Sequence, residues 1–176
     1  MCAAVLAANI LVQFPFTPFG LEDFLTWGAF TYPVTFLVND LTNRRLGLAR
    51  TRRVVYVGFA LAVLLSAWFA SPRIALASGL AFLSAQLLDA TVFNRLRRRA
   101  WWVPPLSSGF ISAALDTAVF FSLAFAGTGL PWQNWALFDY GVKLAMIGLF
   151  LGPYRVLIDR MQAFQGVDTP SVSSRL

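Results

Sequence analysis

Residues 74–94 read IALASGLAFLSAQLLDATVFN, and this stretch decides the class of fold. It is as long as the roughly 20 residues that an α-helix needs to cross the hydrocarbon core of a bilayer. Asp89 is its one ionisable side chain. We therefore expect a membrane-spanning helix, and we expect Asp89 to face protein or a cavity rather than lipid.

Five further apolar stretches predict additional crossings, at residues 3–14, 24–42, 54–70, 107–126 and 135–158. The composition agrees, because 58% of residues are hydrophobic and 12% are charged, against about 25% charged residues in ordinary soluble domains. We predict an all-α polytopic membrane protein, a six-transmembrane-helix bundle with a short or truncated first helix. This transmembrane domain covers residues 1–163, and residues 164–176 form a polar cytoplasmic tail. Because the first stretch is too short to span and begins at Met1, we expect the natural chain to start further upstream.

Arginines cluster in three segments, in a predicted loop at residues 44–53, in another at 95–105 and from Arg155 to the C-terminus. The predicted crossings place all three segments on one side of the membrane, and Arg73 is the one arginine on the other side. Since cytoplasmic segments are enriched in lysine and arginine, we expect an inner-membrane protein with both termini in the cytoplasm. Topology thus explains the net charge of +6, and we do not expect nucleic-acid binding.

Several kinds of catalytic site are excluded by the residue types present. The absence of histidine removes the commonest metal ligand and any serine–histidine–aspartate triad. Lys143 follows Val142 rather than the glycine of a P-loop, and Cys2 is the one cysteine. We predict no metal site, no cofactor and no enzymatic activity.

Polar side chains inside the predicted crossings are the candidate functional residues. A charge at mid-bilayer costs about 3 kcal/mol on insertion scales, so such groups usually face partners or a cavity. The candidate ligand-binding residues are Asn39, Asp40, Gln86, Asp89, Asn94, Ser112, Asp116, Asp139 and Lys143.

Some candidates also have a purely structural interpretation. Asp40 lies one helical turn before Arg44 and can form an ion pair with it. Lys143, the only lysine, can pair with Asp116 at a similar depth on the preceding crossing. It can equally pair with Asp139, one turn earlier on its own helix. The sequence does not decide between these partners.

Short motifs follow one another along most of the chain: LVQFP at 11–15, TWGAF at 26–30, NDLT at 39–42, QLLDATVFNRLR at 86–97, DTAVFF at 116–121 and FDYGVK at 138–143. In their order and residues they resemble the bacterial queuosine precursor transporter family. The resemblance implies a six-helix inner-membrane transporter domain that imports 7-deazaguanine precursors of the tRNA nucleoside queuosine. It implies chiefly 7-cyano-7-deazaguanine, and also the 7-aminomethyl form.

Such a ligand fits the polar residues in the crossings. A guanine-like edge presents adjacent N–H donors, which the carboxylate of Asp89 or Asp116 can accept in bidentate fashion. The remaining edge can be bound by Gln86, Asn39 or Lys143. Aromatic residues that offer a stacking face are Phe93, Phe120 and Tyr140. Ala113 replaces an amide that family members carry three residues before Asp116, which leaves one ligand contact open.

Two hypotheses for the activity are open, the first from the resemblance and the second from the similar size and helix count of another class of protein. The first is a secondary transporter that acts alone, either coupled to protons or by facilitated diffusion. The alternative is a non-transporting substrate-binding subunit of an energy-coupling-factor-type vitamin transporter, which requires partner ATPases. The expected partners are the small-molecule substrate and the lipid bilayer. Small residues spaced four apart near the N-terminus also allow a homodimer.

Overall fold

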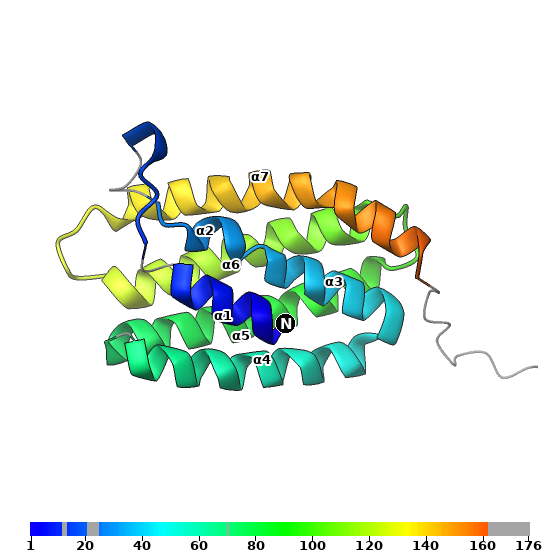
Figure 1. Cartoon of the computed structure of the whole chain (residues 1–176), viewed down its shortest axis with the longest axis horizontal. Helices are drawn as coiled ribbons and strands as arrows, with labels where there is room; N and C mark the ends of the chain where they lie inside the picture. The colour runs from blue at the N-terminus through cyan, green and yellow to red at the C-terminus, as the bar shows by residue number, and fades with distance from the viewer. Residues whose placement is uncertain (12–13, 21–24, 70, 162–176) are drawn as a thin grey trace, which may run out of the picture.

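The computed structural model describes residues 1–11, 14–20, 25–69 and 71–161, and within them every regular element is helical (Figure 1). The elements are α1 (Cys2–Leu11), the short 3-10 helix η1 (Pro18–Gly20), α2 (Gly28–Thr31), α3 (Val34–Leu46), α4 (Leu48–Phe69), α5 (Pro72–Leu96), α6 (Val103–Phe125) and α7 (Trp132–Asp159). The prediction of an all-α chain is confirmed for these residues. The predicted tail at 164–176 lies outside the described residues.

Three helices have the length and apolar composition of membrane-spanning segments. They are α5, α6 and α7, and they contain the predicted crossings at 74–94, 107–126 and 135–158, apart from the last residue of the second. The other predicted crossings correspond to α1, to α2 with α3, and to α4. The total of six crossings stays a prediction.

The predicted crossing at 24–42 is not one continuous helix. Pro33 lies between α2 and α3 and, lacking a backbone N–H, cannot make one of the hydrogen bonds of an unbroken helix. The carbonyl of Tyr32 accepts a hydrogen bond from the backbone N–H of Thr35 at 2.9 Å and another from its hydroxyl at 2.7 Å. The break thus fixes Tyr32 and Thr35 at the head of α3.

The predicted arginine loop at 44–53 is wrong, because most of it is helical. Only Gly47 separates α3 from α4, and its φ of 78° is one that glycine adopts without strain. Arginine is itself a good helix former, so an arginine cluster can mark a side of the membrane without forming a loop.

The three arginine segments meet at one end of the bundle, at the right of Figure 1. The Arg44 Nη1 atom donates to the backbone carbonyl of Arg97 at 3.2 Å. The Arg155 guanidinium lies 5.1 Å from the centre of the Trp101 ring. These contacts confirm that the three segments lie on the same side of the molecule.

At the opposite end, Arg73 on α5 holds the end of α6. Its guanidinium donates to the carbonyl of Leu123 at 2.8 Å and to that of Ala126 at 2.5 Å. Carbonyl groups at a helix C-terminus have no partner within the helix. Arg73, which lies apart from the three arginine segments, therefore has a structural role.

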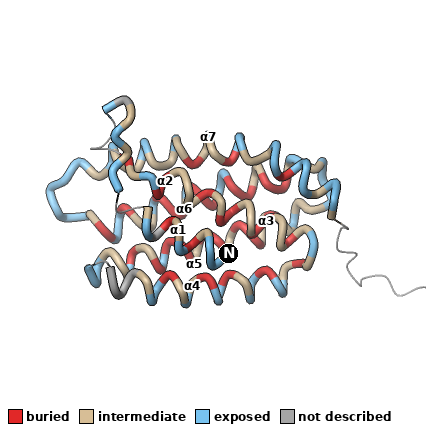
Figure 2. The backbone as a smooth tube through the Cα atoms, in the orientation of Figure 1, coloured by how far each residue is buried: buried red, intermediate tan, exposed pale blue. Residues whose placement is uncertain are grey.

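The core of the bundle surrounds α5, which packs against α3, α4 and α6. Figure 2 shows buried positions concentrated on the inward faces of α5 and α6, whereas the outer faces of α4 and α7 are exposed. One apolar cluster joins four helices through Phe36, Ala85, Ala113 and Ile147. Ala113 is fully buried there, so this position belongs to the apolar core.

Candidate functional site

A cavity of about 480 Å³ lies in the half of the bundle away from the arginine segments. It is bordered by α1 and α2, by the first half of α5 and of α7, and by the second half of α6. Its walls are mostly apolar, and the aromatic side chains that line it are Tyr32, Phe82, Phe120, Phe121, Phe125 and Trp135. The volume lies in the range of roughly 300–1,000 Å³ that is typical of small-molecule sites.

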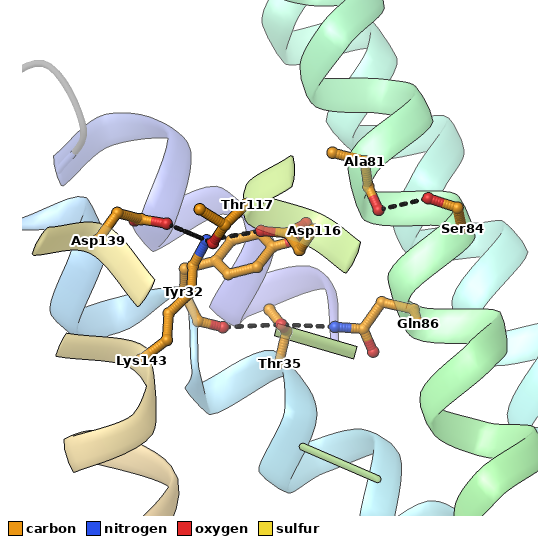
Figure 3. A network of polar contacts seen from close by, with 9 residues as sticks. All are labelled: Tyr32, Thr35, Ala81, Ser84, Gln86, Asp116, Thr117, Asp139 and Lys143. Carbon is orange, nitrogen blue, oxygen red and sulfur yellow. Dashed lines mark hydrogen bonds and ion pairs between the residues drawn. The ribbon is translucent and has the colours of Figure 1, made fainter. Parts of the chain in front are cut away.

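Three of the predicted site residues, Asp116, Asp139 and Lys143, line this cavity. The Lys143 Nζ atom lies 2.7 Å from Asp116 Oδ2 and 2.5 Å from Asp139 Oδ2 (Figure 3). Both ion pairs that the sequence allows are therefore formed at once. One ammonium group between two carboxylates leaves this group of side chains with a net negative charge when all three are ionised.

All three N–H donors of the Lys143 ammonium group have partners inside the protein. The group contacts Asp116, Asp139 and the Thr117 hydroxyl, the last at 3.1 Å. Its exposed fraction is 4%. Lys143 therefore positions the two carboxylates and has no donor left for a ligand carbonyl.

Asp139 is the carboxylate best placed to contact a ligand. Its recorded contacts use Oδ2, with Thr117 Oγ1 donating at 2.8 Å and Lys143 at 2.5 Å. Within the described part of the chain Oδ1 has no protein partner, and 16% of the side chain is exposed. The cavity thus presents one acceptor oxygen of a carboxylate whose position is fixed by its other oxygen.

Tyr32 is a site residue that the sequence analysis did not identify. Its hydroxyl donates to Asp116 Oδ1 at 2.8 Å, and its ring centre lies 5.2 Å from Lys143 Nζ. Asp116 therefore has both carboxylate oxygens bonded, one to Tyr32 and one to Lys143. The break before α3 provides this contact, because it places the tyrosine at the floor of the cavity.

A second polar cluster lies at the crossing of α3 and α5, between the cavity and the arginine end of the bundle. Asn39 Nδ2 donates to Asp89 Oδ2 at 2.7 Å and to the carbonyl of Gln86 at 3.0 Å. Gln86 Nε2 donates to Thr35 Oγ1 at 2.8 Å, and this threonine donates to the carbonyl of Tyr32 (Figure 3). Asn39, Gln86 and Asp89 are fully buried. Hydrogen bonds therefore connect this cluster to the cavity floor.

The remaining predicted site residues lie outside the cavity lining as well. Asp40 accepts a long hydrogen bond from Ser108 Oγ at 3.4 Å. The alternative partner of Asp40, Arg44, instead donates to the carbonyl of Arg97. Ser112 is buried, and its hydroxyl has no partner in the described part of the chain. Asn94 is half-buried near the arginine end of α5.

Of the three aromatic residues expected to offer a stacking face, Phe120 lines the cavity. Phe93 is buried against Tyr154, with 6.4 Å between ring centres. Tyr140 packs against the core cluster and donates to the carbonyl of Phe110 at 3.4 Å. The structure thus leaves Phe120 as the candidate, beside cavity aromatics that the sequence did not single out.

Comparisons with known proteins agree over most of the chain. The family model described as "Putative vitamin uptake transporter" matches residues 26–71 and 65–157. The "Queuosine precursor transporter" of Escherichia coli (strain K12) is 35% identical over 184 residues, which cover 89% of this chain and 82% of the relative. The "Probable queuosine precursor transporter" of Haemophilus influenzae is 35% identical over 192 residues, covering 88% and 82%. No solved structure matches the chain.

Proposed function

The chain belongs to the vitamin uptake transporter family, and on that premise we propose that it imports a queuosine precursor into the bacterial cytoplasm. Family membership confirms the resemblance carried by the sequence motifs and makes the chain a multi-pass membrane protein. It also confirms that the chain is a transporter rather than an enzyme. The precursor that we propose is 7-cyano-7-deazaguanine, with the 7-aminomethyl form as a second substrate.

The observation that carries the proposal is the apolar cavity with a fixed carboxylate at its floor. A deazapurine is flat and mostly apolar on its faces, which suits walls formed by Phe120, Phe121 and Trp135. Its guanine-like edge carries adjacent N–H groups, and the free Oδ1 of Asp139 can accept a hydrogen bond from one of them. Because Lys143 has no free donor, we assign the ring carbonyl of the ligand to a hydroxyl in the lining, such as that of Ser78.

The proposed orientation follows from the arginine segments. We place them in the cytoplasm of an inner-membrane protein with six crossings and both termini inside. The cavity lies in the other half of the bundle, so the described conformation offers its site to the outside. Release to the cytoplasm then requires the polar contacts between the cavity floor and the arginine end to separate, as in alternating access.

The test measures queuosine in the tRNA of cells that cannot make the precursor. Such cells expressing this chain and fed 7-cyano-7-deazaguanine should contain queuosine, and cells expressing the Asp139→Asn variant should contain much less. The Asp159→Asn variant is a matched control, because Asp159 is exposed and pairs only with Arg155 in the described residues. Absence of queuosine despite membrane expression of the unchanged chain would contradict the proposal.

A further inference from the structure

Two buried carboxyl groups lie at the α3–α5 crossing without a cationic partner. Asp40 is 4% exposed and Asp89 is 0% exposed. The ion pairs of the described residues involve Asp116, Asp139 and Asp159, and none involves these two groups. Asp40 and Asp89 also interact electrostatically with each other. Two neighbouring carboxylates cannot both stay charged in a low-dielectric interior without a positive charge nearby.

The same place contains amide oxygens that lack a donor. Asn39 Oδ1, Gln86 Oε1 and Asp89 Oδ1 are buried and have no hydrogen-bond partner among the residues that the structure describes. The amide orientations are fixed, because the Asn39 amide nitrogen donates to two acceptors and the Gln86 nitrogen donates to Thr35 Oγ1. Turning the Asn39 amide would set its oxygen against the Asp89 carboxylate and the Gln86 carbonyl, which are both acceptors. The two amide oxygens therefore face the interior as acceptors, and neither has a donor among the described residues.

The other helices add hydroxyl groups to this place, and in the described part of the chain no lysine or arginine forms an ion pair with Asp40 or Asp89. Ser108 on α6 lies 3.4 Å from Asp40 Oδ1, and Tyr154 on α7 is buried and interacts electrostatically with Asp40. Toward the arginine end of the bundle, the side chains of Arg44 and Arg97 donate hydrogen bonds to backbone carbonyls. Lys143 on α7 is held by the carboxylates of the cavity floor. The cluster is thus an oxygen-only site with two acidic groups.

We propose that the cluster of Asn39, Asp40, Gln86 and Asp89 binds the coupling cation of transport. This cation carries a single positive charge, as Na⁺ held by the oxygens or as a proton shared by the two carboxyl groups. An all-oxygen donor set suits a hard cation of this kind. The inference rests on the proposed transport function and specifies what drives it.

The location of the cluster links cation binding to the cavity. Asn39 and Asp40 lie on α3, and Asp89 lies on α5, so a cation between them ties these two helices together. The head of the same α3 connects through Thr35 and Tyr32 to Asp116 in the cavity floor. A cation bound at the crossing therefore favours the position of α3 in which the floor is assembled. By reciprocity, the substrate favours cation binding.

The experiment measures precursor uptake in liposomes that contain the purified full chain. Labelled 7-cyano-7-deazaguanine is supplied with no gradient, with an inward sodium gradient, or with an inward proton gradient, at zero membrane potential. Coupled one to one, a roughly tenfold gradient of the cation drives up to about tenfold accumulation of this neutral substrate. Accumulation with sodium assigns Na⁺, and accumulation with the pH gradient assigns the proton. Equilibration without accumulation under both gradients overturns the inference but leaves the proposed transport intact.

The variants Asp89→Asn and Asp40→Asn test the location of the site, with Asp159→Asn as the surface control. We expect either buried substitution to bring the accumulation ratio to one, with remaining uptake that no longer responds to the gradient. The control should accumulate the precursor like the unchanged chain.

Accumulation by both buried variants like that of the unchanged chain would overturn the inference. Loss of all uptake in both variants would also overturn it, by assigning the cluster to substrate binding or folding. No uptake by the unchanged chain would contradict the proposed function itself.

Discussion

Replacing Lys143 with methionine removes the cation between two carboxylates and keeps a similar side-chain volume. Asp116 is 4% exposed and would stay buried with only the Tyr32 hydroxyl as a partner. Asp139 has 16% of its side chain exposed, so it can reach water. Removing one partner of a buried ion pair costs about 3–5 kcal/mol. Because water can hydrate the Asp139 carboxylate once Lys143 is removed, we expect the lower value. The unfolding free energy should fall by about 3 kcal/mol.

The assay is equilibrium unfolding of the purified protein in detergent, followed by tryptophan fluorescence. Asp159→Asn is the matched control, because it removes the Arg155–Asp159 ion pair, which has the same four-residue spacing but side chains 48% and 57% exposed. Such exposed pairs contribute about 0–1 kcal/mol. Adding Asp116→Asn and Asp139→Asn to the Lys143 variant should restore most of the lost stability, since no buried charge then remains. Equal losses for Lys143→Met and Asp159→Asn, or no recovery in the triple variant, would show that the ion pairs of Lys143 do not account for the lost stability.

Three further predictions concern the cavity and the packing of its helices. The Asp139→Asn variant should raise KM for precursor uptake roughly tenfold to 100-fold, since a hydrogen bond to a charged group contributes about 1.5–3 kcal/mol; an unchanged KM would count against this contact. The Phe120→Ala variant should weaken precursor binding by about 1–3 kcal/mol, the usual contribution of stacking on a base, and undiminished affinity in a titration would exclude the ring as a stacking face. The Gly109→Ala variant should lower the thermal unfolding temperature, because its Cβ would lie 3.1 Å from a side chain of α7. Gly141→Ala, where nothing lies within 4 Å, should leave that temperature unchanged or raise it, and equal effects of the two glycine substitutions would contradict this packing.

Much of the helical architecture is predictable from the sequence, because long apolar stretches have few alternatives to a membrane-spanning helix. The stretch at 74–94 lies within α5, Pro72–Leu96. The break at Pro33 has an equally local cause, yet a hydropathy pattern does not register it. At the arginine segment 44–53 the sequence suggests an interruption between crossings, but the chain is almost entirely helical there. The charges of this segment suggest a loop, whereas the residue type favours helix and one glycine is enough for the turn.

The site is predictable only in part, because its contacts join residues far apart in the chain. Lys143 and Asp116 can be paired by their similar depth in adjacent crossings. Tyr32 and Asp116 are 84 positions apart, and no local sequence pattern predicts their contact. Nor does the sequence show that Lys143 has all its donors occupied, or that Asn39 and Asp89 lie away from the cavity. These properties depend on how α3 packs against α5, α6 and α7.

We propose that this chain alone carries a queuosine precursor across the membrane through the cavity that Asp139 lines. The most direct measurement is the initial rate of labelled 7-cyano-7-deazaguanine uptake into liposomes that contain only the purified chain. We predict a rate that saturates with precursor concentration and that unlabelled precursor suppresses. Uptake that stays at the level of empty liposomes until an ATPase module is added would contradict the claim and would instead identify the chain as a substrate-binding subunit.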